Sequence, residues 1–299
     1  MTLIYFASPN WDKYQAALPR ALQDAGIAAQ IIVDAPDNPA LVDYVIYAPS
    51  APLQDFTPYT GCKAVLSLWA GVERIVGNQT LTQPLCRMVE DSLTMGMVEW
   101  VCGHVLRHHL GMDAHIVNPA RAWVQTAPPL ARTRHVAMLG MGALGQACAA
   151  ALAGLNFNVT GWSRSGAAVG DIAVLSGQDG LRAALGRADF IVTLLPKTPQ
   201  TENLLNDETL SWAKRGVVVL NPGRGALIED AALLRALNSG QIAHATLDVF
   251  RCEPLPQDHA FWAHPNVTIT PHIAAETRAD GAARAIAQNI ARSMAGAPL

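Results

Sequence analysis

The sequence predicts an α/β fold in which helices cover parallel strands on both faces, and three observations lead to this prediction. Short apolar runs bounded by proline, glycine and aspartate recur along the chain, as expected for strands buried on both faces. Segments whose apolar residues recur at helical spacing separate many of these runs, which is typical of a doubly wound sheet. A glycine-rich turn at residues 134–145 (RHVAMLGMGALG) joins one apolar run to a helix-like segment. With 299 residues, the chain is long enough for two buried cores.

The residues before the glycine turn predict a small α/β unit. We expect strands at 2–7, 27–33, 44–48 and 63–68, and a helix at 11–25 that Gly26 ends. A short glycine-bearing loop, WAGVE at residues 69–73, follows the last of these strands. Open α/β sheets bind ligands at the carboxyl ends of their strands, so we expect the backbone N–H groups of this loop to face a ligand.

A long helix starting at Met95 (MGMVEWVCGHVLRHHLGM) is expected to carry the chain into a second domain. His104 and His108 stand four residues apart on it, a spacing that can ligate zinc. Neither a third ligand nor the glutamate of an H-E-x-x-H motif accompanies them, which favours a polar helix face or an interface. The irregular, proline-rich segment 118–129 contains Trp123 and is either a surface loop or an arm that packs on a partner chain.

The glycine turn has the spacing of a dinucleotide-binding motif. Gly140, Gly142 and Gly145 form G-x-G-x-x-G between an expected strand at 136–139 and a helical composition from Gln146 onward. The first glycine permits a tight turn, the second lets a pyrophosphate approach the backbone, and the third lets the helix pack on the strand. The phosphates would lie at the helix N-terminus, where N–H groups and the dipole favour anions. The alternative is a plain glycine turn in the core; the strand and helix around it favour the dinucleotide.

After the turn, each expected strand ends in a polar cluster. Strands at 158–162, 189–195, 216–220, 243–249 and 267–270 end in WSRS, LLPKTPQT, NPGRG, DVFRCEP and PHIAA, and a helix is expected at 229–239. Carboxyl ends of parallel strands share one edge of a sheet, so these clusters are expected to come together. In the first cluster, Ser163, Arg164 and Ser165 stand where an acidic residue would bind the ribose hydroxyl of NAD.

Composition and charge exclude several functional classes. The formal net charge of −3 offers no basic field for nucleic acid or an anionic membrane. Five widely spaced cysteines without a C-x-x-C pair indicate reduced thiols. The N-terminal residues lack a basic region, and no apolar run reaches membrane-spanning length. We therefore expect a cytoplasmic protein that binds neither nucleic acid nor membrane.

Three residues at separate strand ends, Arg224, Glu253 and His272, suit hydride addition to a 2-oxo acid. The carbonyl oxygen needs a proton donor, and histidine has an unperturbed pKa of about 6.5. A nearby carboxylate favours the imidazolium, and a guanidinium can grip the substrate carboxylate through paired donors. Taken singly, these side chains are as readily explained as a surface charge, a loop residue and a structural histidine.

The order NPGRG, DVFRCEP, PHIAA resembles the NAD(P)-dependent D-2-hydroxyacid dehydrogenase family. The resemblance extends to LLPKTPQTENLLN and GMGALG; it is tight over residues 134–277 and looser before them. Within the family, WSRS and the run EPLPQDHAFWAHPNVTITPHIAAETR are similar to the glyoxylate/hydroxypyruvate reductase A subgroup.

The resemblance implies a role for individual residues. It makes Arg224 the substrate-binding arginine, His272 the acid/base and Glu253 its partner. Asp248 would meet the nicotinamide carboxamide, and the backbone N–H groups of residues 70–72 would hold the substrate carboxylate. The implied cofactor contacts are Gly140, Gly142, Ala143, Leu144, Gly145, Ser163, Arg164, Ser165, Leu195, Pro196, Asn221, Pro222, Gly223 and Asp248. The implied substrate contacts are Trp69, Ala70, Gly71, Arg224 and His272. The resemblance implies no metal. Trp69 stands where the subgroup usually has a small residue, which bears on the size of the pocket.

The resemblance also implies an architecture and an activity. Residues 96–272 would form a Rossmann-type dinucleotide-binding domain inserted into a smaller flavodoxin-like substrate domain of residues 1–95 and 273–299, the last of these containing a helix at 277–294. We expect a homodimer that reduces glyoxylate and hydroxypyruvate to D-2-hydroxy acids, with NADP(H) preferred over NAD(H). The alternatives are a dehydrogenase for pyruvate or a larger 2-oxo acid, and a non-catalytic dinucleotide sensor like the family's transcriptional corepressor. Against the sensor stand the lack of long disordered tails and of a basic patch.

Overall fold

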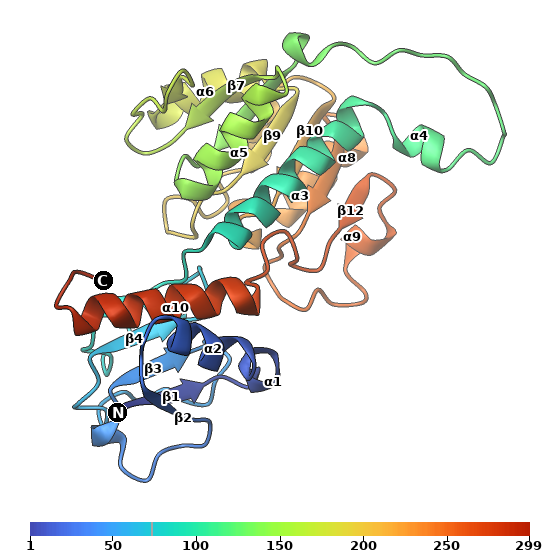
Figure 1. Cartoon of the computed structure of the whole chain (residues 1–299). Helices are drawn as coiled ribbons and strands as arrows, with labels where there is room; N and C mark the ends of the chain where they lie inside the picture. The colour runs from blue at the N-terminus through green and yellow to red at the C-terminus, as the bar shows by residue number, and fades with distance from the viewer. Residues whose placement is uncertain (73) are drawn as a thin grey trace. The chain divides into compact units, whose positions relative to one another are not determined.

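The chain forms two compact units. The computed structural model, shown in Figure 1, describes residues 1–72 and 74–299. One unit comprises Met1–Leu93 and Thr277–Leu299, and the other comprises Thr94–Glu276. Each contains one sheet of parallel strands, which confirms the α/β class predicted from the sequence. In the described ranges, no helix is both long enough and apolar enough to cross a membrane.

The first unit has a sheet with the strand order β2-β1-β3-β4-β5. This is the flavodoxin-like order, in which the chain reverses direction across the sheet between β1 and β3. Its helix α10 packs beside α2, and both bury apolar residues against the strands. The elements are β1 (Thr2–Ala7), α1 (Trp11–Tyr14), α2 (Ala17–Asp24), β2 (Ala29–Ile32), a 3₁₀ turn (Pro39–Leu41), β3 (Tyr44–Tyr47), β4 (Ala64–Ser67), β5 (Leu85–Cys86) and α10 (Ala279–Met294).

The helix expected at 11–25 is wrong in one respect, because it is two helices with a break at Gln15 and Ala16. Pro19 explains the break. A proline has no N–H to donate to the carbonyl group four residues earlier, here that of Gln15, and its ring clashes with that carbonyl. In α2, Pro19 instead lies in the first turn, where a missing N–H costs nothing. Gly26 follows α2 with a φ of 69°, so the predicted helix end is confirmed.

The second unit has a sheet with the strand order β12-β11-β10-β9-β6-β7-β8. From β6 the chain moves outward to β7 and β8 and then returns to the other side of β6 at β9. The carboxyl ends of β6 and β9 therefore flank the switch point at which doubly wound sheets bind ligands. The strands are β6 (His135–Leu139), β7 (Asn158–Trp162), β8 (Val174–Leu175), β9 (Phe190–Thr193), β10 (Val217–Asn221), β11 (Ile242–Leu247) and β12 (Val267–Ile269).

Helices cover both faces of this sheet, and alternate residues of each strand contact opposite layers. Val136 and Met138 of β6 pack with α3 and α5, whereas Ala137 and Leu139 pack with α6 and α8. The helical elements are α3 (Asp91–His109), which begins before the unit boundary, α4 (Asp113–Ile116), a 3₁₀ turn (Ala131–Thr133), α5 (Ala143–Gly154), α6 (Gly177–Arg187), α7 (Asp207–Ser211), a 3₁₀ turn (Gly225–Leu227), α8 (Asp230–Ser239) and α9 (Ala260–Ala263).

The segment between α3 and β6 projects away from the second unit (Figure 1). It contains the short helix α4, which the sequence analysis does not predict, and then the irregular stretch that is predicted at 118–129. Trp123 is 96% exposed, and Ile116, Val117, Val124 and Leu130 are also exposed. A plain surface loop does not need these exposed apolar side chains.

Candidate active site

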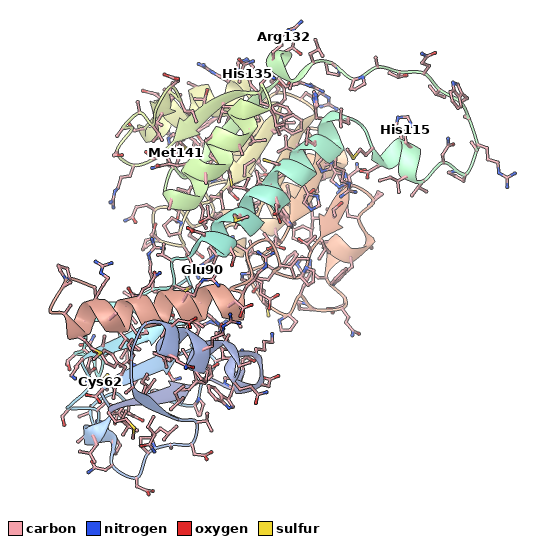
Figure 2. All side chains as sticks on the ribbon, in the orientation of Figure 1. Cys62, Glu90, His115, Arg132, His135 and Met141 are labelled. Atoms are coloured by element: carbon pink, nitrogen blue, oxygen red, sulfur yellow. The ribbon has the colours of Figure 1, made fainter. Side chains whose placement is uncertain are left out.

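The three glycines of the turn after β6 meet different surroundings. A Cβ on Gly145 would overlap the carbonyl oxygen of Gly140, so α5 packs on β6 only with glycine there. Gly140 has a φ of 113°, and a Cβ on it would lie 2.5 Å from the carbonyl oxygen of Leu194. Gly142 is exposed, and a Cβ on it would meet nothing within 4 Å. Figure 2 labels Met141 in this turn and His135 at the other end of β6.

The turn suits the pyrophosphate of a dinucleotide. Gly142 is the N-cap of α5, and the amide of Gln146 is the first to bond back to the carbonyl of Gly142. The amides of the first turn, including those of Ala143 and Leu144, have no partner within the helix. They adjoin the open space in front of Gly142, where an anion is favoured by the helix dipole.

The polar cluster after β7 lies next to this turn. The amide of Gly140 bonds to the carbonyl of Trp162, the residue that precedes the cluster, at 2.8 Å. Ser163 Oγ accepts from the amide of Gly166 at 3.2 Å, and the hydroxyl oxygens of Ser163 and Ser165 are 3.5 Å apart. Arg164 is exposed. A cation and two hydroxyls therefore stand at the end of β7, where dinucleotide-binding proteins recognise the adenosine ribose.

Asn221 connects the end of β9 with the turn after β10. This residue is buried, and its Oδ1 accepts from Thr193 Oγ1 at 2.6 Å and from the amide of Gly223 at 3.2 Å. Its Nδ2 donates to the carbonyl oxygen of Arg224 at 3.0 Å. Pro222 and Gly223 are buried within this turn, whereas Leu195 is half-buried and Pro196 exposed in the loop after β9. Asn221 thus fixes the backbone from which the Arg224 side chain extends.

Arg224 stands beside the loop after β11. Its Nη1 donates to the carbonyl oxygen of Gly223 at 2.7 Å. The next residue, Gly225, lies so close to Phe250 that a Cβ there would overlap the carbonyl carbon of Phe250. The guanidinium charge is a minor contribution to the lowered pKa of Glu253, and it offsets a small part of the rise in the pKa of His272. The structure therefore brings together the three residues that the sequence singles out.

Glu253 and His272 form a hydrogen-bonded pair. Nδ1 of His272 is 2.7 Å from Oε2 of Glu253, while Oε1 of Glu253 accepts from the amide of Phe250 at 2.9 Å. The hydrogen bond to Glu253 raises the pKa of His272 against the effect of burial. Burial alone would raise the pKa of Glu253, but the bonds from His272 and Phe250 lower it. The pair therefore favours an imidazolium beside a carboxylate, and the His272 side chain remains 54% exposed to a reactant.

Asp248, the first residue after β11, is buried and only 1% exposed. Its carboxylate accepts from the amides of Ile273 and Ala274 and from Thr270 Oγ1. Its negative charge contributes to the raised pKa of His272. The family resemblance implies a role for Asp248 but none for Thr270 or for Trp100, whose Nε1 donates to Thr270 Oγ1 at 3.2 Å. No sequence signal relates Trp100 to Thr270, since they are 170 residues apart.

In the first unit, the loop after β4 begins with a local hydrogen-bond pair. The Trp69 amide donates to Ser67 Oγ at 3.1 Å, and that hydroxyl donates to the carbonyl oxygen of Trp69 at 3.0 Å. The guanidinium of Arg74 lies 5.9 Å from the centre of the Trp69 ring. Ala70 and Gly71 follow as half-buried residues, and Glu73 of the same loop lies outside the described residues.

The α3 histidines pack against the second sheet. His108 Nε2 is 2.9 Å from Thr246 Oγ1, and its ring centre is 4.6 Å from that of His244. Burial lowers the pKa of His108 and of His244 to about 4. His104 instead contacts the Trp100 ring. The described part of the chain holds no group of three side chains able to bind a metal ion. These histidines form part of the helix-to-sheet contact.

Comparisons with known proteins identify the family of the chain. Residues 104–274 match the family model of the D-isomer specific 2-hydroxyacid dehydrogenase, NAD binding domain. The glyoxylate/hydroxypyruvate reductase A of Serratia proteamaculans is 34% identical over 303 residues, which cover 98% of this chain and 95% of that protein. The same-named protein of Yersinia enterocolitica is 37% identical over 242 residues, 78% of this chain and 77% of its own length.

Two solved structures are similar along the whole chain. A D-isomer specific 2-hydroxyacid dehydrogenase from Xanthobacter autotrophicus, in complex with NADPH and MES, has a TM-score of 0.90 and 34% identity and covers 100% of this chain and 96% of its own. The NADPH-dependent glyoxylate/hydroxypyruvate reductase of Sinorhizobium meliloti, in complex with NADP and sulfate, has a TM-score of 0.86 and 31% identity, covering 100% and 97%. The family model, the relatives and the two structures agree, and the chain belongs to the D-isomer specific 2-hydroxyacid dehydrogenase family.

Proposed function

We propose that this protein is an NADPH-dependent reductase of small 2-oxo acids, with glyoxylate and hydroxypyruvate as its substrates and the corresponding 2-hydroxy acids, of D configuration where the product is chiral, as its products. The observation that carries the proposal is the His272–Glu253 pair, 2.7 Å apart and beside Arg224, at the sheet edge that bears the dinucleotide turn. The names of the relatives from Serratia proteamaculans and Sinorhizobium meliloti support the choice of substrate.

Each residue of the pair has a distinct part in the reaction. When bound, a nicotinamide cofactor would supply the hydride for the carbonyl carbon of the substrate. Nδ1 of His272 is engaged with Glu253, so Nε2 donates the proton to the carbonyl oxygen. Glu253 keeps the ring in the imidazolium form and fixes its orientation. Arg224 binds and polarises the substrate, and the backbone amides after Trp69, at Ala70 and Gly71, hold its carboxylate.

The cofactor is assigned to the second unit and the substrate carboxylate to the first. The pyrophosphate binds at the N-terminus of α5, beside Gly142 and Ala143. Ser163, Arg164 and Ser165 bind the 2′-phosphate, because a guanidinium between two hydroxyls attracts it and this cluster contains no acidic residue. The remaining assigned contacts are Gly140, Leu144, Gly145, Leu195, Pro196, Asn221, Pro222, Gly223 and Asp248. Two complexes with NADPH or NADP among the similar structures support this preference.

The projecting segment between α3 and β6 is assigned to a homodimer. Its exposed apolar side chains include Trp123, Ile116 and Val117. Burying such residues against a second copy removes apolar surface from water, and twofold pairs are the commonest homo-oligomers. The wild-type protein is expected to sediment as a dimer at micromolar concentration. The Trp123→Ser variant is expected to shift toward the monomer. A monomeric wild-type protein would overturn the assignment.

A panel of 2-oxo acids tests the function. Glyoxylate, hydroxypyruvate, pyruvate and phenylpyruvate are each assayed with NADPH and with NADH. We expect the highest kcat/KM for glyoxylate or hydroxypyruvate with NADPH, and loss of turnover in His272→Ala with NADPH binding retained. A higher kcat/KM for pyruvate or phenylpyruvate would overturn the proposed substrate and leave the reductase activity in place. NADPH binding without turnover of any acid would indicate a dinucleotide sensor.

A further inference from the structure

We propose that Thr270 and Trp100 are positioning residues for the proton donor, acting through the buried carboxylate of Asp248 on the backbone that carries His272. This inference deepens the proposed function and rests on it for the role of His272. Neither side chain is assigned contact with substrate or cofactor. Each acts by holding another group in place.

Asp248 captures three successive amides of the His272 turn. The amide of His272 donates to the backbone carbonyl oxygen of Asp248 at 2.9 Å. The amide of Ile273 donates to Oδ1 at 2.9 Å, and the amide of Ala274 donates to Oδ2 at 3.0 Å. Hydrogen bonds to an ionised acceptor are stronger than neutral ones, and a carboxylate that is 1% exposed needs such partners. One residue therefore fixes the backbone of residues 272–274.

The turn needs to be held because its backbone is unfavourable by itself. His272 has a φ of 55°, in the left-handed region that non-glycine residues rarely adopt. Such a conformation persists only where the surroundings enforce it. About half of the His272 side chain is exposed and unsupported by packing, so its backbone bonds and the bond to Glu253 set the direction of the ring.

We call Asp248 and the three amides of residues 272–274 that it binds the clamp. Thr270 connects this clamp to helix α3. Its Oγ1 donates to Asp248 Oδ1 at 2.5 Å and accepts from Nε1 of Trp100 at 3.2 Å. An indole N–H can only donate, so it occupies a lone pair of the hydroxyl and leaves the single hydroxyl proton for Asp248. Trp100 thereby fixes the orientation of the hydroxyl, and the hydroxyl fixes the carboxylate. The result is a directed chain of hydrogen bonds from α3 to the His272 turn.

Thr268, a residue of β12 two positions before Thr270, provides a matched control. Its Oγ1 also faces α3, where it accepts from Arg107 Nη1 at 3.0 Å and lies 2.8 Å from His244 Nε2. It makes no bond to Asp248 among the described residues. A threonine-to-valine substitution at either position removes a hydroxyl group that contacts α3. Only the substitution at position 270 also removes a hydrogen bond to Asp248.

Kinetics of Thr270→Val, Thr270→Ser, Thr268→Val and Trp100→Phe test the proposal. We expect Thr270→Val to lower kcat by about tenfold, since small misplacements of a catalytic group are costly, with KM and the NADPH Kd within about twofold. Thr270→Ser restores kcat, and Thr268→Val leaves it unchanged at a similar loss of Tm. Trp100→Phe lowers kcat by about threefold and adds nothing to Thr270→Val, because the two residues act through one hydroxyl.

A second measurement is independent of turnover. Hydrogen exchange of the amides of residues 272–274 is expected to accelerate in Thr270→Val and to stay at the wild-type rate in Thr268→Val. Wild-type kcat in Thr270→Val, or equal losses in the two valine variants, would overturn the inference and leave the reductase function standing. If the wild-type protein turns over no 2-oxo acid, the proposed function fails, and unchanged exchange in Thr270→Val then overturns the clamp as well.

Discussion

Nδ1 of His272 lies 2.7 Å from Oε2 of Glu253, and this contact raises the pKa of the histidine while it lowers that of the glutamate. Reduction of a 2-oxo acid uses the imidazolium, so turnover is lost as the pH rises through the raised pKa of His272. The contact thus extends the active range toward higher pH.

In the pH profile of kcat/KM, activity falls on the high-pH side as His272 loses its proton. Glu253→Gln is expected to shift this fall to lower pH, because removal of the carboxylate lowers the pKa of His272. The measurement is the pH profile of glyoxylate reduction with saturating NADPH. Glu208→Gln, at an exposed carboxylate of α7, serves as the control and keeps the wild-type profile. An unchanged profile in Glu253→Gln would argue against the pair.

Arg224→Lys is expected to raise KM for the 2-oxo acid and to lower kcat, because an ammonium group does not reproduce the planar pair of donors. Steady-state kinetics at varied glyoxylate measures both. Arg215→Lys is the control, since this exposed arginine donates to the carbonyl of Ser239 outside the site. Wild-type constants in Arg224→Lys would place the substrate-binding arginine elsewhere.

Arg164→Ala is expected to reduce kcat/KM for NADPH by about 10- to 100-fold, the effect of losing a charged hydrogen bond of about 1.5–3 kcal/mol. Activity with NADH is expected to change little, because NADH has no 2′-phosphate. The same substitution at Arg187, an arginine of α6, serves as the control. An equal loss with both cofactors would show that Arg164 supports the fold rather than the 2′-phosphate.

The second and third glycines of the turn are expected to fail in different ways. Gly142→Ala keeps the fold, since its φ is −76° and its Cβ enters open space, but the methyl group blocks the pyrophosphate. NADPH is expected to bind about tenfold more weakly, as for a clash of about 1.4 kcal/mol. Gly145→Ala overlaps the carbonyl of Gly140 and lowers the free energy of unfolding by about 1–3 kcal/mol. Calorimetric titration and thermal unfolding distinguish the two, and tight NADPH binding by Gly142→Ala would remove the pyrophosphate from this turn.

Acid is expected to destabilise the second unit through His108 and His244. Their pKa is lowered to about 4 in the folded chain, whereas the unfolded value is about 6.5. Between these values the unfolded state binds more protons, so stability falls as the pH drops from about 6.5 to 4. The variant with both histidines replaced by glutamine is expected to show a flatter dependence in urea unfolding at pH 7 and pH 5. His115→Gln, at an exposed position labelled in Figure 2, keeps the wild-type slope, and an equal slope in all three proteins would contradict the cause.

The sequence predicts most strands and the residues at their carboxyl ends, because both depend on local patterns. The strand predicted at 158–162 has the bounds of β7, and Arg224, Glu253 and His272 are found at one sheet edge as expected. Helix α6 was not predicted. It contains Gly177, Gly180 and Gly186, which weaken its helical signal, and it forms because Leu181, Ala184 and Leu185 pack on the sheet.

The support of the candidate site is less accessible to sequence reasoning. Asn221 joins the end of β9 to the turn after β10, and Trp100 reaches Thr270 from a helix 170 residues away. Such contacts depend on which faces meet after folding. Tertiary geometry of this kind leaves no periodic pattern and no local motif in the chain.

Helix α10 completes the core of the first unit with residues from the far end of the chain. Its Ala283, Ile286 and Ile290 pack with Ile4 and Phe6 of β1, although more than 270 residues separate Phe6 from α10. During synthesis, the continuous second unit can therefore fold first, while the N-terminal strands wait for α10 to emerge. Premature termination ahead of α10 would leave that core uncovered, and such fragments would be substrates for chaperones and proteases.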